Sequence, residues 1–426
     1  MSANRVKRLV VLIEGRIAGS LEQDANGRLA FEYDTTYPSD ATPLSPSLPV
    51  SSERFTDRAI SPFIAGLLPD NEQVLDRWSS QFGLRSKSAF ALLSHIGLDC
   101  AGAVQFVTDT DLDAITQSDL VELGENDIEV MLRDLRQNPY TWQQPTGARS
   151  GQFSLAGAQS KFALHRHGDV WARPSGRVPT THILKPSIPG IPDHDLNEHL
   201  CLRAATRLGL LAADSELLRF RSERVVVVKR FDRRRVGGDL HRVHQVDMCQ
   251  ARSVMPDRKY QSDGGPGPLD IIETLRAHAA GVADVERFVH SLIFNWVIAG
   301  TDAHAKNYGL LLSGSSARLT PLYDLASATV LDDWNPHKWE LAMRINGKSR
   351  FKYLTTADWR KFANSVGVDA SDVIATAVRY ADSIGDALID SGNELSSDVT
   401  ERQATTRLID SVTAHAQSIR RTLDRG

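Results

Sequence analysis

Short apolar runs separated by turn residues mark the first hundred residues of the chain. Four of these runs have the length and composition of β-strands: 9–13, 16–21, 28–34 and 101–107. Apolar residues recur at helical spacing in three further segments: 56–66, 71–81 and 88–95. A Pro- and Ser-rich stretch at 37–52 predicts a surface loop between strands and helices. The pattern therefore predicts an N-terminal module of mixed strands and helices.

The rest of the chain changes from a strand-rich to a helix-rich pattern. Beyond an acidic segment, strands are predicted over 161–164, 169–172, 182–185 and 224–231. An irregular region begins at 235 and ends in Gly264-Gly265-Pro266-Gly267. Helices are predicted over 125–137, 195–208, 269–280, 284–299, 356–366, 370–390 and 399–423. This order predicts an α+β protein of three units, 1–108, 109–234 and 235–426.

The composition is that of an ordinary folded protein, with 41% hydrophobic and 24% charged residues among 426. A formal net charge of −4 argues against wholesale nucleic-acid binding by this chain alone. Three widely spaced cysteines exclude a disulfide framework and favour a reducing compartment. No apolar run is long enough for a membrane span, and the run 9–13 is too short for a signal peptide. We expect a cytoplasmic protein without membrane contact.

Three features between residues 154 and 198 match nucleotide-binding chemistry. The small residues of the turn Ser154–Lys161 would let backbone N–H groups approach phosphates, although, taken alone, a tight hairpin turn explains them better. Lys185 ends an apolar strand, as does the lysine by which protein kinases hold the α- and β-phosphates of ATP. Thirteen residues later Glu198 lies early in a helix, where a kinase keeps the partner of that lysine. Acidic residues favour helix starts in any protein, so no single feature is decisive.

Two further features follow in the order that kinases have. The apolar strand Val225–Val228 leads into Lys229-Arg230-Phe231, where a kinase presents backbone groups to adenine, although any core strand looks similar. A helix rich in apolar residues is followed by Asp302 and Asn307, which have the D-x-x-x-x-N spacing of a kinase catalytic loop. Asp324 then stands where a kinase has its Mg²⁺-binding aspartate, although the triplet here is Asp-Leu-Ala.

The order of these five features is more informative than any one of them. Two carboxylates and a carboxamide suit Mg²⁺, which prefers oxygen ligands. Asp302, His304 and Asn307 could alternatively form a hydrolytic metal site, since His and Asp commonly bind zinc. That interpretation leaves Lys185 and the small-residue turn unexplained. The order therefore favours phosphoryl transfer.

At these residues the chain resembles the HipA family, the serine/threonine kinase toxins of bacterial type II toxin–antitoxin systems. The similar stretches are Pro43–Pro49, Leu67–Asp70, Ser154–Lys161, Thr181–Lys185, Asn197-Glu198, Arg230–Arg234, Asp247–Gln250, Lys259–Gly267, Thr301–Asn307 and Leu319–Asp324. The resemblance implies a protein-kinase-like two-lobe fold with an extra mixed N-terminal module and an all-helical C-terminal lobe. The motif pattern gives no physical role to the stretch 247–267.

The resemblance also implies a role for each matching site residue. Asp302 would be the catalytic base, and Asn307 and Asp324 would be the Mg²⁺ ligands. The residues that bind ATP would be Ala156, Gly157, Ala158, Gln159, Ser160, Lys161, Lys185, Lys229, Arg230, Phe231, His304, Ala305, Lys306 and Asn307. Ser154 matches the serine that family members autophosphorylate, which silences the kinase, and Ser160 is a second candidate phosphosite.

The function implied by the resemblance is that of a toxin which phosphorylates an aminoacyl-tRNA synthetase and arrests growth. Its partner would be a helix-turn-helix antitoxin similar to HipB, and the pair would bind operator DNA through the antitoxin. We find no helix-turn-helix signal in this chain, and we interpret Arg230, Arg233, Arg234 and Arg235 as a solvated or substrate-facing cluster. Two other functions stay open, a catalytically weak corepressor acting with its antitoxin and a small-molecule kinase.

Overall fold

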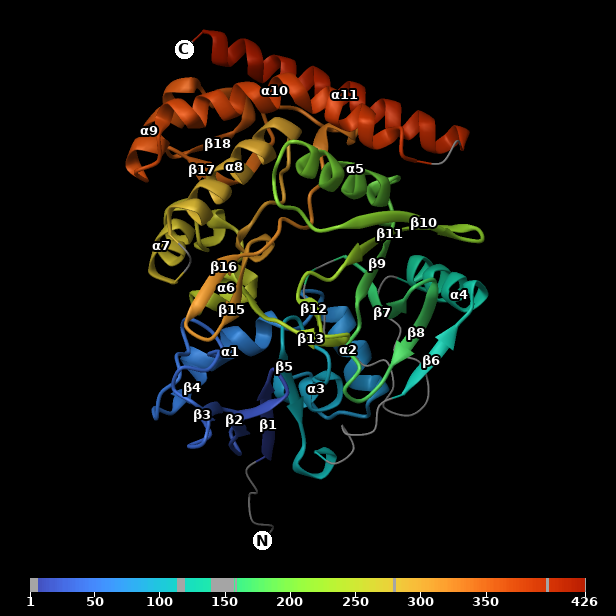
Figure 1. Ribbon diagram of the computed structural model, residues 1–426, viewed down its shortest axis with the longest axis vertical. Helices are drawn as coiled ribbons and strands as arrows, with labels where there is room; N and C mark the ends of the chain where they lie inside the picture. Colours follow the sequence, from blue (N-terminus) through green and yellow to red (C-terminus); the bar gives the residue numbers. More distant parts are fainter. Residues whose placement is uncertain are drawn as a thin grey trace.

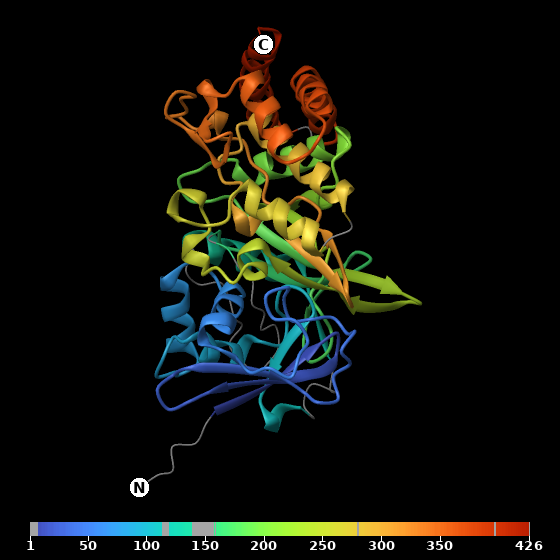
Figure 2. The same ribbon diagram turned by 90° about the vertical axis from the view of Figure 1, so that its left-hand side faces the viewer.

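The structure is a computed structural model that describes most of the chain. The described residues are 7–112, 119–138, 157, 159–278, 281–395 and 398–425. The N-terminal module lies at one end of the long axis, and the last two helices lie at the other end (Figure 1, Figure 2). Within the described ranges, no helix is both long and apolar enough to cross a membrane.

A five-stranded antiparallel sheet of order β4-β3-β2-β1-β5 forms the N-terminal module. Its strands are β1 (Lys7–Ile13), β2 (Arg16–Gln23), β3 (Leu29–Tyr33), β4 (Phe55–Thr56) and β5 (Val104–Val107). Its helices are α1 (Asp57–Gly66), α2 (Glu72–Gln81) and α3 (Ala89–Ile96). Residues 9–13 are all apolar, without alternation, because β1 is buried on both faces. Leu9, Val11 and Ile13 belong to the main core, and Val10 and Leu12 form a separate cluster with Val107.

A six-stranded antiparallel sheet of order β10-β11-β9-β7-β8-β6 forms the second unit. Its strands are β6 (Leu120–Leu123), β7 (Phe162–His167), β8 (Val170–Pro174), β9 (His182–Pro186), β10 (Ser215–Phe220) and β11 (Glu223–Lys229). The helices α4 (Glu125–Gln137) and α5 (His194–Arg207) belong to the same unit. Four of the six strands match predicted ones. The two edge strands, β6 and β10, were not predicted, because each depends on pairing with a single neighbour.

The third unit is mainly helical. Its helices are α6 (Met248–Ala251), α7 (Pro268–His278), α8 (Val282–Ile298), α9 (Thr356–Ser365), α10 (Ala370–Gly392) and α11 (Val399–Asp424). The lobe expected to be all-helical also has strands: β14 (His244–Asp247), β15 (Gly309–Ser313), β16 (Ser316–Leu319), β17 (Glu340–Ile345) and β18 (Lys348–Arg350). The hairpin of β12 (Arg233–Val236) and β13 (Asp239–Arg242) precedes these elements in the chain. Most of this hairpin lies in the region beyond residue 235 that was predicted to be irregular.

A buried ionic network joins the N-terminal module to the second unit. Asp99, which follows α3, is 2.8 Å from Arg233, and Arg230 forms a bidentate pair with Asp232 at 2.7 and 2.9 Å. Against the effect of burial, the surrounding arginines hold the pKa of Asp99 below its ordinary value, so the carboxylate stays ionised. The prediction of a solvated arginine cluster is therefore wrong for Arg230 and Arg233, which are buried, while the other two arginines of that cluster are exposed.

Candidate active site

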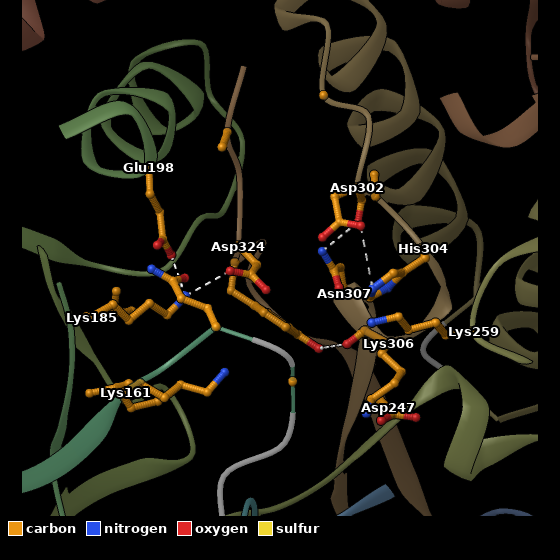
Figure 3. A pocket seen from close by; sticks show the side chains of 18 of the residues that line it. Lys161, Lys185, Glu198, Asp247, Lys259, Asp302, His304, Lys306, Asn307 and Asp324 are labelled. Carbon is orange, nitrogen blue, oxygen red and sulfur yellow. Dashed lines mark hydrogen bonds and ion pairs between the residues drawn. The ribbon is translucent and has the colours of Figure 1, made fainter. Parts of the chain in front are cut away.

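One cavity of about 400 Å³ is lined by residues of all three units. Asp70 comes from the N-terminal module, Lys185 from β9, and Asp302 and Asp324 from the helical lobe. Figure 3 shows Lys161 and Lys185 on one side of this space, opposite the segment that carries Asp302. The fold thus brings residues that are far apart in the sequence to one site.

Lys185 forms ion pairs with two carboxylates in this cavity. Its Nζ is 2.6 Å from Glu198 Oε1 and 2.8 Å from Asp324 Oδ1 (Figure 3). Burial alone would lower the pKa of Lys185, but Asp324 and Glu198 raise it above its ordinary value. Lys185 in turn outweighs the burial of Asp324 and holds the pKa of that carboxyl below its ordinary value. Lys185 and Asp324 are therefore both charged at neutral pH.

The backbone at Asp324 is held in an uncommon conformation. Its φ of 59° lies in the left-handed region, which costs a non-glycine residue free energy although aspartate tolerates it better than most. The preceding residue anchors it, because the Tyr323 hydroxyl donates to the Lys306 carbonyl at 2.7 Å. The carboxylate of Asp324 faces the cavity.

The loop after α8 folds back on itself and presents Asp302. The amide of Asn307 donates to the Asp302 carbonyl at 2.9 Å, and the backbone N–H of His304 donates to the same carbonyl at 2.8 Å. Only glycine fits at position 300, since a Cβ there would lie 2.2 Å from Asn295 Oδ1. The carboxylate of Asp302 stays 65% exposed, with His304 Nε2 3.9 Å from Oδ1. The predicted residues of this loop are therefore brought together.

The same loop contains the residues that could alternatively form a hydrolytic metal site. Among the residues that the structure describes, no group of three or more His, Cys, Asp or Glu side chains could hold a metal ion. A zinc site with several protein ligands of these types is thus not formed around Asp302 and His304. Mg²⁺ needs fewer protein ligands, because phosphate oxygens and water complete its octahedron.

The predicted phosphate loop is described only in part. Ser154, Ala156 and Ala158 lie outside the described residues. Gly157 has a φ of 105°, and a Cβ there would lie 2.7 Å from the Nζ of the buried Lys161. Gln159 and Ser160 are half-buried, and the Gln159 side chain donates to the Pro186 carbonyl at 3.2 Å.

The predicted adenine segment, Lys229-Arg230-Phe231, lines the cavity. The guanidinium of Arg230 lies in the buried ionic network and cannot serve as an adenine contact. Two backbone donors of the segment are also engaged, since the N–H of Lys229 and of Arg230 donate to the carbonyls of Asp214 and Thr181, each at 2.9 Å. The groups of this segment that remain available to contact adenine are therefore its backbone carbonyls and the side chain of Phe231.

Sequence reasoning missed three residues that reach this site. Asp70 contacts two lysines of the helical lobe, Lys306 through Oδ1 and Lys259 through Oδ2 at 2.9 Å. Tyr260 donates a hydrogen bond from its hydroxyl to Asp302 Oδ1. Their stretches, Leu67–Asp70 and Lys259–Gly267, were singled out by resemblance but given no role. No local pattern indicates a contact between residues 189 positions apart.

Comparison with known proteins adds family-level information to this geometry. The model of the HipA N-terminal domain matches residues 9–107, and the model of the HipA-like C-terminal domain matches residues 153–388. A Sinorhizobium fredii protein named "Putative kinase Y4mE" is 35% identical over 424 residues, which are 97% of this chain and 99% of that protein. The serine/threonine-protein kinase toxin HipA of Shewanella oneidensis is 29% identical over 402 residues, 91% of this chain and 90% of the toxin.

A solved structure agrees with the fold over almost the whole chain. HipA of Shewanella oneidensis, solved with HipB and its operator DNA, superposes with a TM-score of 0.85 and 26% identity. The superposition covers 98% of this chain and 98% of that one. The expected α+β class, with its mixed N-terminal module, is thereby confirmed.

Proposed function

Because the chain belongs to the HipA family of toxin kinases, we propose that it transfers the γ-phosphate of ATP to a serine or threonine hydroxyl of a protein. The observation that supports this most strongly is the pairing of Lys185 with Glu198 and Asp324, across the cavity from Asp302 and Asn307. Protein kinases require a paired lysine, a metal-binding aspartate and a catalytic-loop Asp and Asn together. Residues of these types line one cavity of this chain, which supports the proposal.

The residues of the cavity fit ATP and Mg²⁺. Asp324 and Asn307 would hold Mg²⁺, which would neutralise charge on the β- and γ-phosphate oxygens. Lys185 and Lys161 would add positive charge on the side of the second unit. The absent side chain of Gly157 leaves space beside Lys161 Nζ that a Cβ would fill, as a close approach of phosphate requires.

In the proposed mechanism Asp302 orients the acceptor hydroxyl and takes its proton as the new O–P bond forms, while the bond between the γ-phosphorus and the bridging oxygen breaks and ADP leaves. Its exposed carboxylate is accessible to a protein substrate. Asn307 keeps the loop closed through its hydrogen bond to the Asp302 carbonyl, and Lys185 neutralises charge on the α- and β-phosphates. Most of the acceleration would come from positioning and charge neutralisation, because the loose transition state needs little covalent help.

The proposal extends to the biological role. The Shewanella oneidensis relative was solved with HipB and operator DNA, and we propose a HipB-like helix-turn-helix antitoxin, and operator DNA through it, as partners of this chain. The proposed protein substrate is an aminoacyl-tRNA synthetase in the cytoplasm, whose phosphorylation would arrest growth. Autophosphorylation of Ser154 would switch the kinase off. The family resemblance supports these three statements.

The proposal is tested by incubating the phosphatase-treated chain with Mg²⁺ and ATP. We expect one added phosphate in the intact mass, located on Ser154 by peptide mass spectrometry. Ser154→Ala should remove that phosphate, while Ser315→Ala, a matched control at an exposed serine between β15 and β16, should retain it. A chain that neither binds ATP nor gains phosphate would favour the corepressor function. ATP turnover without phosphate on protein would favour a small-molecule kinase.

ATP binding is expected to take up protons at a pH above 8. Burial and the nearby charge of Lys185 lower the pKa of Lys161 to about 8, so the amine is partly neutral above that value. Phosphate oxygens favour the charged form and raise the pKa again, so binding draws a proton from the buffer. Calorimetry of ATP binding in buffers of different ionisation enthalpy measures this uptake. Lys161→Arg should abolish it, because a guanidinium stays protonated; equal uptake in both proteins would contradict the assignment.

A further inference from the structure

The stretch Lys259–Gly267 is a tightly wound segment beside the catalytic loop. It contains a short turn, Gln261–Asp263, and the N–H of Gly265 donates back to the Tyr260 carbonyl at 2.9 Å. A Cβ at Gly265 would lie 1.9 Å from the Arg258 carbonyl oxygen, and a Cβ at Gly267 would lie 2.3 Å from the Gln261 side chain. The glycines thus permit a fold that other residues would obstruct, and this fold fixes where Lys259 and Tyr260 point.

Both residues contact the loop that carries Asp302. The Lys259 carbonyl accepts a hydrogen bond from the N–H of Ala305 at 3.2 Å, which docks the two segments together. The Tyr260 ring packs edge-on against His304, with centroids 4.9 Å apart and an interplanar angle of 82°. From this position the Tyr260 hydroxyl donates to Asp302 Oδ1. Lys259 and His304 are labelled on the same side of the cavity as Asp302 in Figure 3.

The Asp302 carboxylate has little else to fix it. Its side chain is 65% exposed. Among the described residues, only Tyr260 donates a side-chain hydrogen bond to that carboxylate. Burial and the hydrogen bond to Asp302 raise the pKa of Tyr260, so the hydroxyl keeps its proton and remains a donor. Without this contact the carboxylate would be free to rotate about its side-chain torsions.

We propose that Tyr260 is a positioning residue for phosphotransfer, whose hydroxyl holds one carboxylate oxygen of Asp302 so that the other faces the acceptor hydroxyl. The inference rests on the proposed function, because it assigns Tyr260 a role through the base of that reaction. A general base is effective only when its oxygen lies within hydrogen-bond reach of the proton that it takes. A carboxylate that is held at one oxygen spends more of its time with the other oxygen within reach of that proton than a carboxylate that rotates freely.

Tyr260→Phe tests the inference, because it removes only the hydroxyl and leaves the ring against His304. Starting from phosphatase-treated protein, the initial rate of phosphate transfer from ATP to the chain itself is measured. We expect this rate to fall about tenfold. The affinity for a non-hydrolysable ATP analogue and the melting temperature should not change. Tyr353→Phe, at a tyrosine that is 51% exposed, is the matched control and should keep the wild-type rate.

A double mutant separates positioning from a structural role. Since Tyr260 acts through Asp302, adding Tyr260→Phe to Asp302→Asn should cause no further loss, whereas independent effects would multiply. A Tyr260→Phe protein with the wild-type rate overturns the inference. A faster one also overturns it and shows that the hydroxyl blocks the base from the acceptor. A parallel loss of ATP affinity and melting temperature shows a structural role instead. A wild-type chain that transfers no phosphate overturns the proposed function and this inference with it.

Discussion

Asp302→Asn is expected to lower the rate of phosphotransfer by about three orders of magnitude while ATP still binds. Asparagine keeps the size of the side chain and an oxygen that accepts the Tyr260 hydrogen bond, but it cannot take a proton from the acceptor hydroxyl. The Asn307 contact should persist, because it goes to the Asp302 backbone carbonyl at 2.9 Å. The rate of ³²P transfer and the affinity for a non-hydrolysable ATP analogue measure the two expectations separately.

Asp257→Asn is the matched control for this substitution. Asp257 is exposed and lies in the turn Pro256–Arg258, just before the segment that contacts the catalytic loop. The same loss of charge at that position should leave the rate at the wild-type level. If Asp302→Asn were as active as Asp257→Asn, Asp302 would not be the base. If it lost ATP affinity as well, the effect would lie in the shape of the cavity instead.

The sequence predicted the parts of the site that are set by local geometry. Lys185 lies in a strand and Glu198 in the helix that follows it, with a single connection between them. This connection allows few arrangements of two residues thirteen positions apart, so their pairing could be predicted from the spacing. Asp302 and Asn307 lie on one short loop that closes on itself. Such contacts depend on elements adjacent in the chain, and a spacing rule describes them well.

Contacts between the units could not be predicted in the same way. Asp70 reaches Lys306 across 236 positions, and this contact exists only because the N-terminal module docks against the helical lobe. Arg230 looked like a solvated residue because three more arginines follow it at positions 233–235. The structure buries it with Asp232, which stands two positions away and compensates its charge. The sequence of β12 offers no apolar alternation, since three arginines occupy its first three positions, and its strand character comes from pairing with β13.

Asp324→Asn is expected to lower phosphotransfer by about three orders of magnitude and to raise the Mg²⁺ concentration that half-maximal activity requires. Lys185 keeps the pKa of Asp324 below its ordinary value, so the native side chain is an anion at assay pH. Asparagine offers one neutral oxygen in place of that charge, which suits Mg²⁺ less well. The initial rate across a Mg²⁺ titration measures the effect. Asp332→Asn, at a side chain that is 100% exposed, is the control and should match the wild type.

Glu198→Gln separates the two roles that Asp324 could have. In the native chain Lys185 lies 2.6 Å from Glu198 and 2.8 Å from Asp324, so Asp324→Asn and Glu198→Gln each leave the lysine one carboxylate partner. If Asp324 served only to hold Lys185, the two variants would lose similar activity and would respond alike to Mg²⁺. If Asp324 is a metal ligand, Asp324→Asn alone should need a higher Mg²⁺ concentration, whereas Glu198→Gln should keep the wild-type Mg²⁺ response at a reduced rate. Equal Mg²⁺ responses in all three proteins would remove Asp324 from the proposed metal site.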